Sequence, residues 1–320
     1  MKDAFLNIKD LHVEYTSGGQ VVKAVNGVNI TLNKGETLGL VGETGAGKTT
    51  IAKAILRILP QPPAKIRSGE IWLEDQNLLA IPEKDMLKIR GGKIAMIFQD
   101  PMTALNPLMT VGDQIAEVLL LHQTEDKKTA MEKAGDMLEM VGIPRERYVE
   151  YPHQFSGGMK QRVVIAMALA CDPELLLADE PTTALDVTIQ AQVLDMIRDL
   201  RDKLETSMIL ITHDLGVVAE TCDSVAVVYA GQIVESGSKE DLFDHPTHPY
   251  TLGLFGSLPS MAVGEKRLHS IVGLPPDPTN LPEGCAFWPR CPHACEACKG
   301  NIPNREITPG HFVRCIKEEK

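Results

Sequence analysis

A glycine-rich run before residue 50 limits the possible folds of this chain more than any other feature. An apolar strand pattern at 38–41 leads into the run, and helical spacing at 49–59 follows it. In such a setting backbone N–H groups can wrap a polyphosphate, with Lys48 reaching the β and γ phosphates and Thr49 offering its hydroxyl to Mg²⁺. A glycine-rich turn without a ligand explains this setting less well. The run matches the pattern G-x-x-x-x-G-K-S/T in full, with Gly42, Glu43, Thr44, Gly45, Ala46, Gly47, Lys48 and Thr49.

A second apolar run delivers two carboxylates. Residues 175–178 have the pattern of a buried strand, and Asp179 and Glu180 follow directly. Ligands bind at the carboxyl ends of strands in open α/β sheets, so Asp179 is placed to hold Mg²⁺ and Glu180 to orient or deprotonate an attacking water. Such a pair is by itself more often a solvated strand end. Together with the phosphate loop, the catalytic interpretation is the stronger one.

Charge and hydropathy exclude several classes of protein. The chain of 320 residues has 32 Lys and Arg against 43 Asp and Glu, a net charge of −11, so a broad nucleic-acid-binding face is not expected. The N-terminal residues carry early charges, among them Lys2 and Asp3, and offer no signal-peptide pattern. The longest uncharged apolar run, 163–171, is about half of what a bilayer-spanning helix needs. We expect a cytosolic protein that reaches a membrane only through a partner.

Short apolar runs alternate with helical spacing, which is typical of an α/β sheet protein. Between 110 and 170 no strand pattern occurs, so this stretch is expected to be a helical insertion. Prolines and cysteines become frequent near the C-terminus, and a boundary is expected near residue 257. Strands are predicted at 38–41, 70–73, 94–98, 175–178, 208–212 and 225–229, and helices at 49–59, 111–122, 127–141, 158–170 and about 188–204.

A short motif before the carboxylate strand narrows the class. Ser156, Gly157 and Gly158 open an apolar helix, where Ser156 can cap the helix and small residues expose N–H groups that can grip a γ-phosphate. Here the sequence resembles the ATP-binding-cassette ATPases. In that family the phosphate belongs to the opposite subunit, so the resemblance implies a dimer with ATP at the interface. The common signature is Leu-Ser-Gly-Gly-Gln, and Phe155 and Met159 replace its outer residues.

Other positions match the family one by one. Gln99 resembles the glutamine that senses Mg²⁺ and water, and His213 resembles the switch histidine that contacts the γ-phosphate. The run 183–186, which ends at Asp186, resembles the family's D-loop. Tyr15 is similar to the aromatic residue that stacks on adenine, although a single aromatic is also a common structural residue. The resemblance implies that ATP is bound by Tyr15, residues 42–49, Thr50, Ser156, Gly157, Gly158 and Asp186. It implies that Mg²⁺ is held by Thr49, Gln99 and Asp179. The catalytic residues that it implies are Lys48, Gln99, Glu180 and His213.

Four segments, 99–112, 179–192, 245–251 and 274–292, closely resemble the ATPase subunits of dipeptide and oligopeptide importers, of the D type. The resemblance implies a subunit that lies peripherally on the cytoplasmic face of the cell membrane and energises import. Its implied partners are a second ATPase subunit, identical or different, two transmembrane permeases docked after Gln99, and indirectly an extracytoplasmic peptide-binding protein. Nickel and antimicrobial-peptide importers share these segments. A soluble ABC ATPase acting on ribosomes or DNA is the rival, disfavoured by the single cassette and the acidic charge.

The C-terminal cysteines form a pattern of their own. Cys285, Cys291, Cys298 and Cys315 resemble the part of the same subunits in which four thiolates can hold a 4Fe–4S cluster, and Cys295 is extra to that pattern. Zn²⁺ is the alternative, because Cys295 and Cys298 with His293 or His311 give other ligand sets, and spacing does not choose the metal. A staple suits a proline-rich tail with little core of its own.

The expected architecture is an α/β, P-loop (RecA-like) ABC ATPase core with an antiparallel β subdomain near the N-terminus. Residues 1–257 form the nucleotide-binding domain, with a helical subdomain at about 102–170. Residues 258–320 form a short irregular metal-binding extension. We expect this extension to fold against the ATPase core or its partner, and the phosphate site to lie in a separate domain from it.

Overall fold

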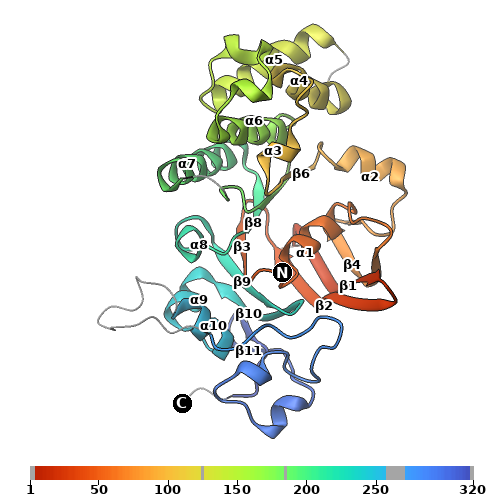
Figure 1. Cartoon of the computed structure of the whole chain (residues 1–320), viewed down its shortest axis with the longest axis vertical. Helices are drawn as coiled ribbons and strands as arrows, with labels where there is room; N and C mark the ends of the chain where they lie inside the picture. The colour runs from red at the N-terminus through yellow and green to blue at the C-terminus, as the bar shows by residue number, and fades with distance from the viewer. Residues whose placement is uncertain (1–3, 124–125, 184–185, 257–270, 318–320) are drawn as a thin grey trace. The chain divides into compact units, whose positions relative to one another are not determined.

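The computed structural model describes residues 4–123, 126–183, 186–256 and 271–317. The chain divides into two compact units, one formed by Met1–Ala80 with Ile211–Lys320 and the other by Ile81–Leu210. Both contain strands and helices (Figure 1). The boundary expected near residue 257 lies outside the described residues. No helix within the described ranges is long and apolar enough to cross a bilayer.

The first unit begins with an antiparallel sheet, as expected for the N-terminal subdomain. Its strands are β1 (Leu6–Ser17), β2 (Gln20–Leu32), β4 (Ala64–Leu73) and β5 (Gln76–Asn77), in the order β2-β1-β4-β5. Gly18 and Gly19 both have positive φ, which makes the tight turn between β1 and β2. Tyr15 pairs with Val22 on one side and with Ala64 on the other. The register therefore fixes Tyr15 near the end of β1.

A second set of strands in this unit has the order β11-β12-β10-β9-β3. The strands β3 (Thr37–Val41) and β9 (Ser224–Tyr229) are parallel and almost entirely buried, which explains their continuous apolar sequence. β10 (Gln232–Ser238) pairs antiparallel with β9 and also with β12 (His311–Val313), which pairs with β11 (Arg305–Thr308). The C-terminal extension is therefore not wholly irregular, because two of its segments join a sheet.

The helices of the first unit are short. They are α1 (Lys48–Ile55), α8 (Leu215–Thr221), α9 (Lys239–Asp244) and α10 (Pro249–Phe255). The expected helix at 49–59 ends earlier than predicted, because Arg57 takes a left-handed φ of 53° just beyond the C-cap at Leu56. Helical φ is negative, so the chain cannot continue the helix through this residue.

The second unit contains the strands β6 (Ile94–Ile97), β7 (Leu175–Asp179) and β8 (Ser207–Ile211), with β6 and β7 parallel. The stretch from 110 to 170 contains helices and no strand among its described residues, as predicted. Helices α4, α5 and α6 pack against one another (Figure 1). The helices are α2 (Glu83–Ile89), α3 (Pro101–Ala104), α4 (Val111–His122), α5 (Lys127–Met140), α6 (Gly157–Leu169) and α7 (Val187–Leu204), with 3-10 turns at Arg145–Val149 and Pro152–Gln154.

Candidate nucleotide-binding site

The glycine-rich run forms the loop between β3 and α1, as the sequence predicts. Gly42 has no room for a side chain, because a Cβ there would lie 2.2 Å from the carbonyl oxygen of Val228. Gly47 caps α1 with φ 108°, and a Cβ there would lie 2.4 Å from the carbonyl oxygen of Ala24. Both positions thus require glycine, because neighbouring backbone approaches closely. The helix α1 begins directly after the loop, so its N-terminus lies at the end of the loop.

Lys48 lies inside this loop. Lys48 is only 6% exposed. Its Nζ donates hydrogen bonds to the carbonyl oxygens of Gly42 at 2.7 Å and Glu43 at 3.0 Å. These two carbonyl oxygens hold the ammonium group of Lys48 against the loop.

Tyr15 and the start of α1 meet in the same unit. The hydroxyl of Tyr15 lies 3.4 Å from Oγ1 of Thr50, which follows Thr49 on the first turn of the helix. The structure thus brings the predicted adenine-stacking residue close to the start of α1, although Tyr15 precedes Gly42 by 27 positions in the sequence.

In the second unit, the predicted carboxylates follow β7. Asp179 is buried at the end of the strand, and Glu180 takes a left-handed φ of 46°. Oε2 of Glu180 accepts hydrogen bonds from Nε2 of Gln99 at 2.8 Å and from Oγ1 of Thr183 at 2.9 Å. Gln99 and Glu180, assigned related roles from sequence, therefore lie side by side.

The signature serine caps α6. Oγ of Ser156 accepts a hydrogen bond from the backbone N–H of Met159 at 3.4 Å. Nothing lies within 4 Å of a Cβ placed on Gly157, whereas a Cβ on Gly158 would approach Cγ2 of Ile189 in α7 to 2.7 Å. The first glycine therefore leaves space at the helix start, and the second allows α6 to pack against α7.

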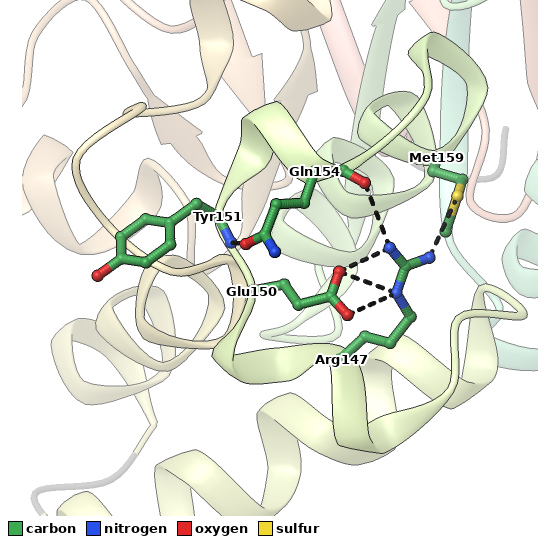
Figure 2. Close-up of polar contacts among 5 residues, drawn as sticks. All are labelled: Arg147, Glu150, Tyr151, Gln154 and Met159. Carbon is green, nitrogen blue, oxygen red and sulfur yellow. Dashed lines mark hydrogen bonds and ion pairs between the residues drawn. The ribbon is translucent and has the colours of Figure 1, made fainter.

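The two residues that depart from the common signature, Phe155 and Met159, share one neighbour, Arg147, whose contact with Met159 is drawn in Figure 2. Nη1 of Arg147 donates to Sδ of Met159 at 3.4 Å, and its guanidinium carbon lies 4.3 Å from the centre of the Phe155 ring. Arg147 also forms an ion pair with Glu150 at 2.6 Å, which raises the pKa of the arginine and lowers that of the glutamate. Sequence reasoning missed Arg147 and Glu150, because their i, i+3 spacing occurs on many surface turns.

Two further predicted residues lie at helix or strand ends. Asp186 is the N-cap of α7 and accepts the backbone N–H of Ile189 at 3.0 Å, while Ala184 and Leu185 of the same motif lie outside the described residues. His213 is exposed and follows β8. Their roles toward ATP stay predictions.

The five C-terminal cysteines line one cavity of about 210 Å³, together with His248 and His293. Burial raises the pKa of the Cys285, Cys291 and Cys298 thiols above its usual range. No group of three or more metal-binding side chains within the described residues is arranged to hold a metal ion as it stands. His311, considered above as a zinc ligand, lies elsewhere, because its Nε2 is 2.9 Å from Oε1 of the buried Glu235.

The C-terminal extension contacts the phosphate loop, although the phosphate site was expected to lie in a separate domain from it. Arg290, between Cys285 and Cys291 in sequence, forms an ion pair with Glu43 of the phosphate loop at 2.8 Å. Both residues belong to the same compact unit. No local pattern indicates this contact, because it joins residues 247 positions apart.

Comparison with known proteins agrees with these observations. Residues 25–183 match the family model "ABC transporter", and residues 234–298 match "Oligopeptide/dipeptide transporter, C-terminal region". The oligopeptide transport ATP-binding protein OppD of Bacillus subtilis is 51% identical over 313 residues, 97% of this chain and 87% of its own length. The dipeptide transport ATP-binding protein DppD of the same organism is 50% identical over 318 residues, 98% and 95% of the two chains. OppD of Escherichia coli is 48% identical over 317 residues, 98% and 94%.

Among solved structures, a dimeric ATP-binding cassette in a post-hydrolysis state, bound to ADP and Pi, matches with a TM-score of 0.66 and 25% identity. The match covers 73% of this chain and 98% of that one. Three findings lead to one assignment. They are the cassette fold, the phosphate loop and relatives about 50% identical over almost the whole chain. The chain belongs to the ABC transporter ATPases, in the branch of the oligopeptide and dipeptide transport ATP-binding proteins.

Proposed function

We propose that this chain is the ATP-binding and ATP-hydrolysing subunit of a membrane importer for dipeptides or oligopeptides. The observation that carries the proposal is the contact between Glu180 and Gln99 beyond a buried strand, in a chain that also has a complete phosphate loop. The names of the half-identical relatives, which are oligopeptide and dipeptide transport proteins, supply the cargo class.

In the proposed reaction, the N–H groups of the phosphate loop and Lys48 bind the phosphates of ATP, and Tyr15 stacks on adenine. Thr49, Asp179 and Gln99 offer the oxygen ligands that Mg²⁺ prefers, and the bound ion would neutralise charge on the phosphates. Glu180 orients a water molecule and accepts its proton as the water oxygen attacks the γ-phosphorus, which releases ADP and phosphate. His213 contacts the γ-phosphate.

A second ATPase subunit, identical or different, completes the site. Its signature residues, equivalent to Ser156, Gly157, Gly158 and Asp186 here, contact the γ-phosphate across the interface. The open space beside Gly157 supports this arrangement, because a phosphate must approach the N-terminus of α6 closely. The solved cassette that this fold matches is itself a dimer.

Two transmembrane permeases are the proposed membrane partners, and an extracytoplasmic peptide-binding protein delivers cargo to them. The segment after Gln99 supports docking, because Met102 and Leu108 are 61% and 85% exposed although both are large and apolar. This chain would then lie peripherally at the cytoplasmic face of the membrane. Import of nickel or antimicrobial peptides, and soluble ABC activity without transport, are the alternatives.

The C-terminal cysteines are proposed to hold a 4Fe–4S cluster through Cys285, Cys291, Cys298 and Cys315, with Zn²⁺ as the alternative. All four line one cavity, and thiolate is the ligand that both metals accept. Burial raises the pKa of the Cys285, Cys291 and Cys298 thiols, so metal binding at these three must displace protons. The group would supply a covalent staple between the segments that carry the four cysteines.

Uptake by reconstituted vesicles tests the proposed function. The chain is assembled with its co-purified permeases and second ATPase, and the cargo is a labelled dipeptide or pentapeptide supplied with the binding protein. We expect uptake that requires ATP and is lost when Lys48 is replaced in Lys48→Ala. ATP hydrolysis that responds to Ni²⁺ and not to peptide, or an ATPase that purifies without any permease, would contradict the assignment.

A further inference from the structure

The phosphate loop is held at Glu43 by the cysteine-rich extension. Nη1 of Arg290 lies 2.8 Å from Oε2 of Glu43, and Nη2 lies 3.0 Å from Oε1, so the pair is bidentate. The arginine side chain is 6% exposed and that of the glutamate 28%. Two parallel charge-assisted hydrogen bonds fix direction as well as distance, and solvent screens a partly buried pair less than an exposed one.

Arg290 is itself held in place from other sides. Nη1 donates to the hydroxyl of Tyr229 at 3.2 Å, and Nε donates to the carbonyl oxygen of Val272 at 3.2 Å. The guanidinium carbon also lies 5.8 Å from the ring centre of Phe287, which precedes it in the extension. Arg290 is therefore not a loose surface side chain that happens to reach Glu43, because three groups besides Glu43 define its position.

A second contact holds Glu43 from α10, and an aromatic cluster links that helix to the extension. The backbone N–H of Glu43 donates to the hydroxyl of Tyr250 at 2.9 Å. The ring of Tyr250 lies 4.5 Å from that of Tyr229 and 5.4 Å from that of Phe287, between ring centres. Phe287 also lines the cysteine cavity. A buried aromatic cluster, formed by Tyr229, Tyr250 and Phe287, thus fills the space between the phosphate loop and the cysteines.

Glu43 in turn determines the shape of the loop. Its carbonyl oxygen accepts hydrogen bonds from Nζ of Lys48 at 3.0 Å and from the backbone N–H of Ala46 at 3.1 Å. A displacement of Glu43 would therefore move an acceptor of the lysine that faces the phosphates. Sub-ångström changes in such groups alter binding measurably, because preorganised donors lose their alignment.

We propose that Arg290 is a positioning residue of the ATP site, acting through Glu43, and that it couples ATP binding to the folded state of the cysteine segment. ATP binds more tightly when the segment 285–298 is in place, and bound ATP stabilises that segment by the same factor, since equilibrium coupling is reciprocal. The inference rests on the proposed ATP site, but it does not depend on which metal the cysteines hold.

The test measures ATP affinity in the full chain with a fluorescent ATP analogue displaced by unlabelled ATP. We expect Arg290→Gln and Glu43→Gln each to raise Kd for ATP by roughly tenfold, within the usual range of coupling factors. The double variant should be no weaker than either single variant, because both remove the same interaction. Arg290→Lys, which keeps the charge but not the bidentate geometry, should fall between wild type and Arg290→Gln.

Lys299→Gln is the matched control, because Lys299 is a cation of the same extension that pairs with Glu296 at 2.8 Å and not with the loop. It should change Kd by less than about twofold. Purely structural damage by Arg290→Gln would add to that of Glu43→Gln in the double variant. Additive losses, or wild-type affinity in Arg290→Gln, would overturn the proposal.

The reciprocal measurement uses thiol alkylation in metal-depleted protein. The non-hydrolysable analogue AMP-PNP should slow alkylation of Cys285, Cys291 and Cys298 in the wild type, and this protection should disappear in Glu43→Gln at saturating nucleotide. Failure of the wild-type chain to bind ATP at all would refute the proposed function. Normal ATP binding without protection would refute only the coupling inferred here.

Discussion

At the scale of single residues, the candidate site depends on backbone conformations that few side chains adopt. Glu180 has a φ of 46°, which costs a non-glycine residue about 1 kcal/mol or more. Hydrogen bonds from Gln99 and Thr183 to its carboxylate compensate for that cost locally. Backbone strain of this kind is common at functional sites.

Glu180→Gln should retain ATP binding but lower ATP turnover by about 10²-fold to 10⁴-fold, because the amide cannot accept the proton of the attacking water. Lys48 and the phosphate loop are unchanged, so a stable nucleotide-bound dimer should accumulate. Phosphate release and size-exclusion chromatography measure the two effects. Glu174→Gln is the control, since Glu174 lies directly before β7 and pairs with Lys93 at 3.2 Å. Wild-type turnover in Glu180→Gln would contradict the assigned role.

At the scale of secondary-structure elements, helix starts carry much of the candidate site. α1 begins at the phosphate loop, α6 begins at Ser156 and α7 begins at Asp186. Helix N-termini offer N–H groups without intrahelical partners, which makes each a place where an anion is stabilised. The side-chain caps of α6 and α7 satisfy one donor each and leave others at the end of the helix.

Ser156→Arg should block nucleotide-driven dimerisation while leaving ATP affinity of the isolated subunit within about twofold, because bulk and charge would fill the space where a phosphate of the partner approaches. Sedimentation of the Glu180→Gln background with and without the change measures dimerisation. Loss of a serine cap costs about 1 kcal/mol of stability by itself. Ser238→Arg controls for that cost, since Ser238 caps α9 through the N–H of Asp241. If Ser156→Arg weakened ATP binding by the isolated subunit as much as it weakened dimerisation, the motif would contact the ATP bound to its own subunit, and the assignment would be wrong.

Strongly periodic elements were predictable from the sequence. The helices α4, α5 and α6 fall within one residue of the ranges expected at 111–122, 127–141 and 158–170. β11 and β12 were missed, because strands of four and three residues at a sheet edge give too short a pattern to detect. The early end of α1 depends on the left-handed φ of Arg57, which no local propensity indicates.

Contacts between distant residues of the candidate site were only partly predictable. Gln99 follows β6 and Glu180 follows β7, and the sequence motifs indicate both strand ends. Because β6 and β7 are parallel neighbours, their carboxyl ends lie together and bring Gln99 to Glu180. No motif announces the ion pair of Arg290 with Glu43 or the contacts of Arg147 with Met159 and Phe155. Arginine is common on surfaces, so its sequence position does not reveal which carboxylate or ring it meets.

At the scale of the whole molecule, the cysteine segment changes the expected organisation of the chain. It was expected to fold against the ATPase core or its partner as a domain separate from the phosphate site, and it shares a compact unit with the phosphate loop and contacts it through Arg290. A metal that folds this segment would therefore support the ATP site as well as the C-terminus. This predicts that metal loss reaches nucleotide binding directly, and not only through assembly of the transporter.

Anaerobically purified protein should be brown and carry about four irons and four sulfides per chain if the proposed cluster is present. Serine in place of Cys285, Cys291, Cys298 or Cys315 should bleach it, expose the extension to proteolysis and raise Kd for ATP by about the same factor as Arg290→Gln. Cys295→Ser is the control and should leave colour and Kd nearly unchanged, although its Sγ lies 3.6 Å from that of Cys298. Metal analysis, limited proteolysis and ATP titration measure the three effects on each variant. Colourless protein with one zinc would show that the cysteines hold Zn²⁺ and not a cluster. Bleaching by Cys295→Ser but not by Cys298→Ser would show that Cys295 is a ligand in place of Cys298. Bleached variants that keep the wild-type Kd for ATP would show that the metal does not affect the ATP site.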